Sequence, residues 1–521
     1  MKRLWKGPSR PIVGISCSIA AAIAAGAIAS AASASTGAAR AAKSKSSPVF
    51  VVANTSSVQK LDPDVVTNFL DFQALGLIYD TLVQFNNKLQ VTPDLATSWK
   101  FSDHNRVLTF QLRKGVKFDD GTTFTSADVV ASLQRAENPK VADASASFLA
   151  SMKRVVPVGQ YAVKLELSRP DTSVLDGLTS INFAMLSKKA IAAGTLSKKP
   201  DGTGPYKFVS WSPNNSFTVA ANPAYWGHKP SIQKIEIKTI ASEQSIASAL
   251  EAHTVQLGLL TEPQVADHLP KSFKVQKVLD LSYRALMLQD KTGPLANLDN
   301  RLALECAISR QQVVASAVLG QGQAVGPVPL GPYKSSPISA VCPTQNLAKA
   351  RSYLKLAGDP GGFSFTAMTS TDLDPTSAAQ ATTVQADLAR VGIHMTIQNL
   401  AGNSYIQDWL KGDFQAAFAE NGADPDPYVM YGRYFGAGAN LAVPAGYSSP
   451  ALQKLLLKSD QATTPAALKA ANAAVSRYLT ANAVWDWLFD SYDYAVFPST
   501  LHGFQLPPNR QLQSLKFATI S

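Results

Sequence analysis

The stretch that decides the fold is FQLRKGVKFDDGTTFTSADVV, which occupies residues 110–130. It begins in a strand predicted over Val107–Leu112, where apolar and polar residues alternate. Lys114-Gly115 and Asp120-Gly121 then predict turns, because glycine adopts a positive φ at low cost and aspartate bonds nearby backbone amides. The stretch therefore predicts a strand followed by two turns.

A helix follows these turns, and similar elements extend outward in both directions. Ser126 is a suitable N-cap for a helix over Ala127–Arg135, which carries an acid in its first turn. Further strands are predicted at 48–53, Tyr161–Leu167, Phe217–Ala220, Ile232–Ile240, Ser364–Ala367, His394–Gln398 and Ala416–Ala419. Further helices are predicted at Val65–Leu82, Glu243–Ala252, Asp299–Leu319, Asn346–Leu356, Ala378–Val391 and Ser404–Lys411. This alternation predicts α/β layers with mixed sheets, and without a short internal repeat a solenoid or propeller is not expected.

The composition is that of a globular protein. The chain has 521 residues, of which 46% are hydrophobic and 16% are charged, with a net charge of +11. Four of the basic residues lie within the first ten, and the others are scattered among acids. No basic stripe interleaved with aromatic residues is present, so we expect no nucleic-acid partner.

Residues 1–34 have the pattern of a secretory signal peptide. A basic start precedes an alanine-rich apolar run, and Ala32-Ser33-Ala34 is a small-residue cleavage site. Two alternatives stay open: an uncleaved anchor, because the run is long enough to span a bilayer, and lipidation at Cys17, although that cysteine lies early in the run. Residues 35–47 predict a flexible linker. We therefore expect an exported protein of the periplasm or extracellular envelope, cleaved near Ala34.

Two cysteines remain after such cleavage, Cys306 and Cys342. An exported protein meets an oxidising compartment, where the two could close a loop as a disulfide. The alternative is a pair of buried free thiols, and the sequence leaves both open.

The motifs also carry a family resemblance. Besides residues 110–130, they are Leu61-Asp62-Pro63, Ile78–Val83, Thr92–Trp99, Gly202–Phe208, Asn222–Gly227 and Asp299-Asn300-Arg301. With these motifs the chain resembles the peptide/nickel-binding receptors of ABC importers, the family 5 solute-binding proteins, over about residues 48–435. Their physical role is mainly structural: the glycines permit tight corners, and Tyr225-Trp226 supplies large apolar area.

The resemblance implies a two-lobed periplasmic-binding-protein fold of type II, in the three-domain oligopeptide-receptor variant, with a hinged cleft. Lobe I would comprise residues 48–85, 199–280 and 491–521. Domain II would be an insertion at 86–198, and lobe II would comprise 281–490. A solute would be buried between the lobes when they close. The implied partners are a peptide or peptide-like ligand and a membrane permease, for a monomer without a cofactor or enzymatic activity.

The resemblance also implies candidate ligand-binding residues. The acidic segment Phe418–Pro427 would bind the ligand's amino group through Asp424, which we prefer, or through Glu420, with Asn421 beside them. The alternative is that these acids only cap turns next to prolines. Thr55 and Ser56 would point into the cleft from the carboxyl end of the first strand. Tyr283 would line the cleft. A ligand carboxylate would need a basic partner, and Arg433 is close in sequence to the acidic segment.

Other functions stay as alternatives. A metal or metal-chelate receptor is one, although the six histidines form no metal-binding motif. A receptor for an oligosaccharide or another small molecule and a peptide sensor without an import role would use the same fold. An enzyme is not expected, because neither a nucleophile elbow nor a metal motif is present.

Overall fold

The computed structural model describes residues 48–521 except 144, 328–340, 423, 425 and 463. The predicted signal peptide at 1–34 and the linker at 35–47 lie outside the described residues. In the described part, strands and helices alternate and form mixed sheets, which confirms the predicted α/β class. Every helix in this part of the chain is too short or too polar to span a bilayer.

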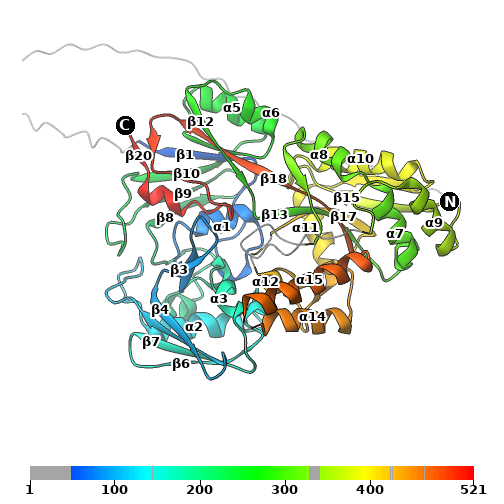
Figure 1. Cartoon of the computed structure of the whole chain (residues 1–521). Coiled ribbons are helices and arrows are strands. Elements are labelled where there is room, and N and C mark those ends of the chain that lie inside the picture. Colours follow the sequence, from blue (N-terminus) through cyan, green and yellow to red (C-terminus); the bar gives the residue numbers. More distant parts are fainter. Residues whose placement is uncertain (1–47, 144, 328–340, 423, 425, 463) are drawn as a thin grey trace, which may run out of the picture. The chain divides into compact units, whose positions relative to one another are not determined.

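Twelve strands of the described residues form one large mixed sheet (Figure 1). One part of it follows the order β11-β1-β10-β9-β8, in which β1 runs parallel to β10 and β11. The strands of this part are β1 (Phe50–Asn54), β8 (Tyr206–Ser212), β9 (Ser216–Ala221), β10 (Lys234–Thr239), β11 (Leu257–Leu260) and β12 (Phe273–Leu279). Helices α1 (Phe69–Leu75), α5 (Glu243–Glu251) and α6 (Pro263–Asp267) contribute to the two cores beside it.

The other part of the large sheet follows the order β16-β15-β17-β13. Its strands are β13 (Ser282–Leu288), β14 (Gly322–Ala324), β15 (Ser364–Thr369), β16 (His394–Asn399) and β17 (Ala416–Gly422). One core on it contains α7 (Leu298–Ala307), α8 (Arg310–Val318), α9 (Leu347–Ala357) and α10 (Ser377–Ala389). A second core contains α11 (Gly402–Lys411), α12 (Pro427–Phe435), α13 (Ala442–Ala445), α14 (Pro450–Asp460) and α15 (Pro465–Ala481).

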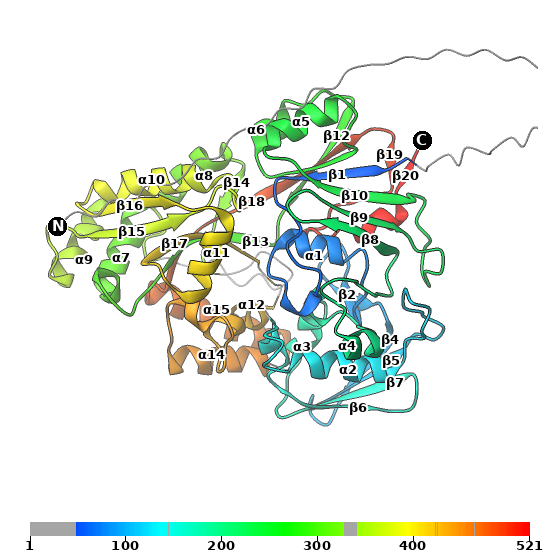
Figure 2. The same cartoon turned by 180° about the vertical axis from the view of Figure 1, so that it is seen from behind.

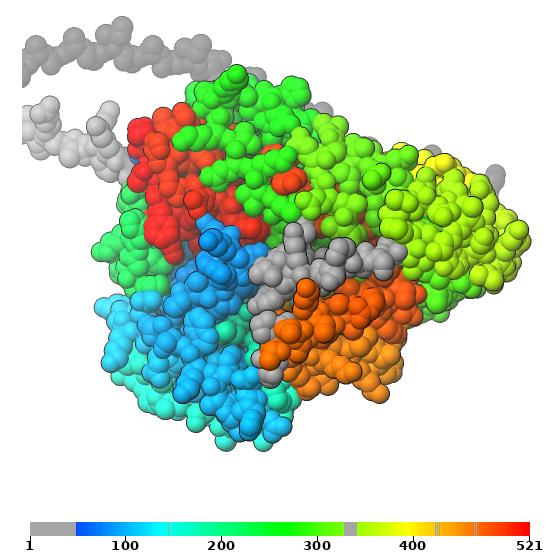
Figure 3. All heavy atoms as spheres, viewed as in Figure 1, coloured from blue at the N-terminus to red at the C-terminus, as the bar shows by residue number. Residues whose placement is uncertain are grey.

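A single long strand, β18 (Trp485–Pro498), belongs to both parts of the large sheet. Its first residues pair with β13 and β14, and its later residues pair with β11 and β12. The partner changes between Ser491, which pairs with Gly322, and Tyr492, which pairs with Leu279. Figure 3 shows the C-terminal residues in red against green residues from the middle of the chain, as this pairing requires.

A separate antiparallel sheet has the order β4-β5-β7-β6 (Figure 2). Its strands are β4 (Ala96–Ser102), β5 (Val107–Leu112), β6 (Met152–Pro157) and β7 (Ala162–Leu167). Helices α2 (Ser126–Ala136), α3 (Ser173–Gly177) and α4 (Lys188–Ala193) lie in the same segment, and α2 and α3 contribute to the core of the sheet. Short pairs are β2 (Val83–Phe85) with β3 (Val91–Pro93), and β19 (Leu501–His502) with β20 (Thr519–Ile520).

The motif glycines permit a close backbone contact, as the sequence predicts. A Cβ on Gly202 would lie 2.1 Å from the carbonyl oxygen of Ile78, and one on Gly204 would lie 2.5 Å from the same atom. Such contacts exclude any side chain at either position. Beside them, Asp80 accepts hydrogen bonds at 2.9 Å from Thr203 and from Trp226. Residues of three separate motifs therefore meet at one buried corner.

The long helix predicted at Val65–Leu82 is wrong. The structure has α1 there, which ends at Leu75 with Gly76 as its C-cap. The next residues leave the helix because their backbone pairs elsewhere: the Leu77 and Ile78 carbonyls accept hydrogen bonds from Tyr206 and Gly204. The apolar spacing that indicates a helix reflects burial in a loop.

Two smaller predictions about helix ends are also wrong. The helix predicted at Asp299–Leu319 is two helices, α7 and α8, because Ser309 caps a new N-terminus by accepting from the Gln312 amide. Helix α2 begins at Ser126 itself, and Thr125 is its N-cap in a capping box with Asp128. The hydroxyl of Ser126 donates instead to the Gly159 carbonyl.

Cys306 and Cys342 form a disulfide, which settles the open alternative.

Candidate ligand-binding site

A cavity of about 260 Å³ lies at the carboxyl ends of strands from both parts of the large sheet. Residues that follow β1, β11 and β15 line it, together with the last residues of β17. Helices α1, α11 and α12 and Arg510 of the C-terminal segment complete the wall. Such strand ends are the usual place for a ligand in α/β proteins, because side chains of separate loops converge there.

Four of the six predicted ligand-binding residues line this cavity: Thr55, Ser56, Glu420 and Asn421. The other two lie elsewhere. Asp424 lines a second, neighbouring cavity, and Tyr283 is buried in β13 outside both linings. The ligand-binding roles of all six residues stay predictions.

The loop after β1 presents free hydroxyls to the cavity. The Asn54 side chain turns this loop by accepting from the Ser56 amide at 2.8 Å. The hydroxyls of Thr55 and Ser56 form no hydrogen bond with any residue that the structure describes. They can therefore donate to or accept from a bound molecule.

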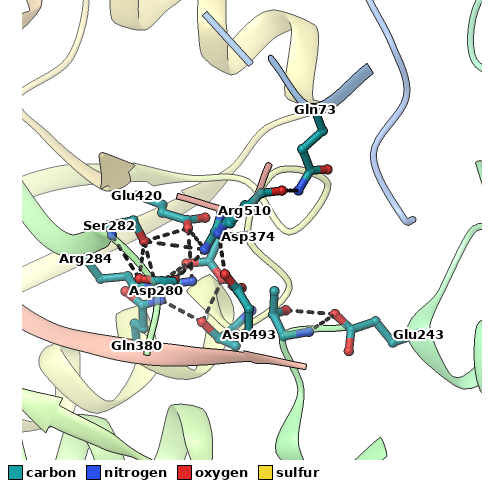
Figure 4. Close-up of polar contacts among 12 residues, drawn as sticks. Gln73, Glu243, Asp280, Ser282, Arg284, Asp374, Gln380, Glu420, Asp493 and Arg510 are labelled. Atoms are coloured by element: carbon teal, nitrogen blue, oxygen red, sulfur yellow. Dashed lines mark hydrogen bonds and ion pairs between the residues drawn. The ribbon is translucent and has the colours of Figure 1, made fainter. Parts of the chain in front are cut away.

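A buried cluster of charges forms one side of the cavity (Figure 4). Arg284 of β13 lies 3.0 Å from Asp280, 3.2 Å from Glu420 and 3.7 Å from Asp374. Arg510 lies 2.5 Å from Asp493 and 2.6 Å from Glu420, and it also contacts Asp280. Both guanidinium groups hold several acids at once, which fixes the carboxylates in place.

The cluster holds more acids than bases. Two arginines face four carboxyl groups, those of Asp280, Asp374, Glu420 and Asp493. Asp280 has both oxygens occupied, by Ser282 and by the arginines. Burial raises its pKa, but Arg510 and Arg284 outweigh this and hold the pKa of Asp280 below its usual value. A cation would complete the balance of buried charge.

Two carboxylate oxygens are available for such a cation. Glu420 uses Oε1 for Ser282 and both arginines, and no donor among the described residues contacts its Oε2. Asp493 contacts Arg510 through Oδ2, and no residue that the structure describes donates to its Oδ1. Burial raises the pKa of Asp493 to about 7, although Arg510 opposes the shift.

Asn421 is held by its neighbours. Its carboxamide oxygen accepts from the Tyr434 hydroxyl at 2.8 Å, and its nitrogen lies 3.6 Å from the sulfur of Met287. The apolar walls of the cavity are formed by the aromatic residues Phe69, Phe72, Tyr405, Trp409 and Tyr434. The walls favour an apolar body in the ligand, and the charges favour a polar end.

Asp424 has a structural role in the turn before α12. Its carboxylate accepts from the Asp426 amide at 2.9 Å, and Asp426 caps α12 by accepting from the Tyr428 amide at 2.8 Å. Burial raises the pKa of Asp424 to about 7. This is the turn chemistry that the sequence leaves as an alternative.

The second cavity has a volume of about 670 Å³. Residues around β2 and β3 line it together with the C-terminal segment between Pro507 and Phe517. It shares six lining residues with the first cavity: Phe69, Phe72, Ser145, Asn182, Gly422 and Arg433. The two cavities are therefore neighbours with a common wall.

Sequence reasoning missed the arginines and acids that complete the charge cluster. A signal for them exists, because Arg284 lies in a strand whose residues are all buried, and Asp493 lies in a largely buried apolar strand. Charged residues in such strands are rarely buried without partners, so they mark a site. In the residues described, no group of three or more His, Cys, Asp and Glu side chains is arranged to hold a metal ion.

Known proteins with similar sequences are solute-binding proteins. The family model "Bacterial extracellular solute-binding proteins, family 5 Middle" matches residues 90–441. A probable D,D-dipeptide-binding periplasmic protein of Escherichia coli is 28% identical over 405 residues, which cover 74% of this chain and 77% of that protein. A dipeptide-binding protein of the same organism is 27% identical over 429 residues, which cover 74% and 79%.

A solved structure is also similar. It is an ABC transporter-associated periplasmic binding protein of Helicobacter pylori in complex with the peptide STSA. The TM-score is 0.83 at 26% identity, and the match covers 91% of this chain and 98% of that one. The similarity confirms the periplasmic-binding-protein fold.

Proposed function

The chain belongs to the family 5 bacterial extracellular solute-binding proteins, and we propose that it captures peptides or peptide-like solutes for an ABC importer. It is a binding protein and not an enzyme. Import implies a partner in the membrane, the permease that receives the solute. The peptide ligand is supported by the relatives that carry peptide-binding names and, independently, by the charges of the cavity.

The observation that carries the proposal is the surplus of buried carboxylates at the cavity. The free amino group of a peptide is a cation, and Glu420 Oε2 and Asp493 Oδ1 are available to accept its hydrogen bonds. Hydrogen bonds from the ammonium group to a carboxylate are charge-assisted and are worth about 1.5–3 kcal/mol each. The hydroxyls of Thr55 and Ser56, in the loop after β1, would bond the peptide backbone.

The two-lobed arrangement is part of the proposal. The change of partners along β18 between Ser491 and Tyr492 supports a hinge where lobe I (48–85, 199–280 and 491–521) meets lobe II (281–490). Contacts of domain II (86–198) with lobe II support a closed form, because Arg169 lies 2.7 Å from Asp460 and Ser173 donates to Asp426 at 2.6 Å. Opening would break these contacts and admit the solute.

The export route and the oligomeric state are inferred from the sequence. Residues 1–34 would direct the chain across the membrane and be cleaved near Ala34, and the linker at 35–47 would follow. The mature protein would act as a monomer and bind no nucleic acid. Its family acts outside the cytoplasm.

Calorimetric titration with trialanine and N-acetyl-trialanine tests the amine site. We expect Glu420→Gln to weaken binding of trialanine by about 10- to 100-fold, because a charged acceptor is replaced by a neutral one. Acetylation of the peptide should weaken binding to the native protein by a similar factor. The Glu420→Gln variant should bind trialanine and N-acetyl-trialanine with nearly equal affinity.

Two further variants locate the amine. Asp120→Asn changes an exposed turn acid that bonds Thr122 and Lys189 outside the cavity, so it should bind as the native protein does. Asp424→Asn tests the acid that the sequence favours. A larger loss from Asp424→Asn than from Glu420→Gln would move the amine to the second cavity, and equal binding of both peptides would refute an amine site.

A further inference from the structure

We propose that Arg433, in the wall shared by the two cavities, binds a carboxylate of the solute. The inference deepens the proposed peptide-binding function and rests on it. It assigns to Arg433 the opposite end of the recognition that Glu420 begins.

Arg433 has donors without acceptors. Its Nη2 donates to the Gly422 carbonyl at 2.8 Å, and its guanidinium lies 4.9 Å from the ring centre of Tyr434. Its Nε is buried without a hydrogen-bond partner in the described part of the chain, and no carboxylate there forms an ion pair with it. A buried donor without an acceptor destabilises the protein, so an acceptor supplied by the solute would be favoured.

Other arginines of the interior have carboxylate or carbonyl partners, and even the Nε of Arg284, which makes no hydrogen bond in the described part of the chain, lies 3.7 Å from Asp374. Arg284 and Arg510 each contact three carboxyl groups, and Arg135 contacts two. Arg301 donates only to backbone carbonyls, but it makes four such bonds. Arg433 differs because it lines both cavities, makes one hydrogen bond and forms no ion pair with the residues that the structure describes.

The spacing suits a short zwitterion. Arg433 bonds the carbonyl of Gly422, which is two residues beyond Glu420 on β17. Two residues of a strand span about 7 Å, and the backbone of an extended dipeptide has about the same length. An amine at Glu420 would therefore place a carboxylate beside Arg433.

The carboxylate has two chemical sources. It is the C-terminus of a dipeptide, or an acidic side chain at the second residue of a longer peptide that continues into the second cavity. Gly422 lines both cavities, and a Cβ there would lie 3.5 Å from Phe69 and 3.8 Å from Arg433, so the missing side chain leaves space beside the guanidinium. The cavity of about 670 Å³ has room for the continuing chain.

Three peptides separate these sources in calorimetric titrations: alanyl-alanine, its C-terminal amide, and the amide of alanyl-aspartyl-alanyl-alanine. We expect at least one of the two carboxylate-bearing peptides to bind native protein tenfold or more tightly than the simple amide. Preference for the first alone assigns the site to the C-terminus, and preference for the third assigns it to an acidic side chain.

Arg433→Met should abolish the preference, because the side chain keeps its packing on Tyr434 and loses its charge. Arg113→Met is the matched control: Arg113 also stacks on an aromatic ring, that of Trp226 at 4.1 Å, and donates to a carbonyl, that of Asp94, outside both cavities. The control should keep the preference.

Two results would overturn the inference. If native protein binds all three peptides equally, no carboxylate is recognised, and this outcome does not depend on how the variant folds. If Arg433→Met keeps the full preference for a carboxylate-bearing peptide, another residue recognises the carboxylate. Failure to bind any of these peptides or trialanine would refute the proposed function itself, so the two failures are distinguishable.

Discussion

At the scale of single residues, Arg510 organises the candidate site. It contacts Asp280, Glu420 and Asp493, which lie between 17 and 230 positions away along the chain. Its guanidinium also lies 4.6 Å from the ring centre of Phe69, a wall residue of both cavities. A guanidinium with several fixed acceptors orients carboxylates more strictly than an ammonium could, so Arg510→Lys would not be conservative.

Asp493 should make peptide binding dependent on pH. Burial raises its pKa to about 7, and the Coulombic pull of Arg510 opposes that shift. Below this pH the carboxyl group is protonated and attracts an ammonium group less, while above it the carboxylate is charged. We predict that affinity for trialanine weakens as the pH falls from about 8 to about 5, by up to about tenfold per unit.

The dependence should disappear in Asp493→Asn when affinity is titrated across the same range. Asp119→Asn is the control, because burial also raises the pKa of Asp119 to about 7 but Asp119 lines neither cavity. A pH profile that survives in Asp493→Asn would assign the titration to another group.

Part of the site could be predicted at this scale and part could not. Thr55 and Ser56 follow the first predicted strand, Glu420 and Asn421 lie in the acidic segment, and all four line the cavity. Arg510 and Asp493 could not be found in the same way, because only tertiary folding brings them to Glu420. Asp424 also comes from a local segment that the sequence identifies. Its carboxylate bonds within its own turn, however, and the residue lines the second cavity rather than the first.

At the scale of elements, periodicity predicts strands better than the ends of helices. The strand predicted at Val107–Leu112 has the bounds of β5. The helix predicted at Val65–Leu82 shortens to α1 because the following carbonyls bond Gly204 and Tyr206, more than a hundred positions away. A pattern of apolar residues records burial, and only the tertiary partners decide whether the backbone bonds within a helix or outside it.

The disulfide is an element-scale contribution to stability. Cys306 is in α7, and Cys342 lies 36 positions later, after α8 and β14. Closing a loop of this length is worth about 4 kcal/mol in the chain-entropy model. We predict that Cys306→Ser combined with Cys342→Ser lowers the free energy of unfolding by up to this amount, as measured by denaturant titration.

Peptide affinity should stay unchanged, because neither cysteine lines a cavity. Native protein under a reductant is the matched control and should unfold like the double variant. Equal stability of the variant and the oxidised native protein would show that the bridge contributes nothing.

At the scale of the whole molecule, the sign of charge reverses between the chain and its cavity. The full sequence carries a net charge of +11, yet four carboxyl groups face two arginines at the buried cluster. Charges on the surface are solvated by water, whereas buried charge must be matched locally. Net charge therefore does not predict the polarity of the ligand, and the cavity does.

The peptide ligand can be tested by mass spectrometry of the solute that co-purifies with the exported protein and is released by mild denaturation. We predict short peptides with a free amino group and a carboxylate, which match Glu420 with Asp493 at one end and Arg433 at the other. Recovery of a sugar, a metal chelate or another solute without an amine would contradict this prediction. The family and the fold would then stand, but the surplus carboxylates would need a different explanation.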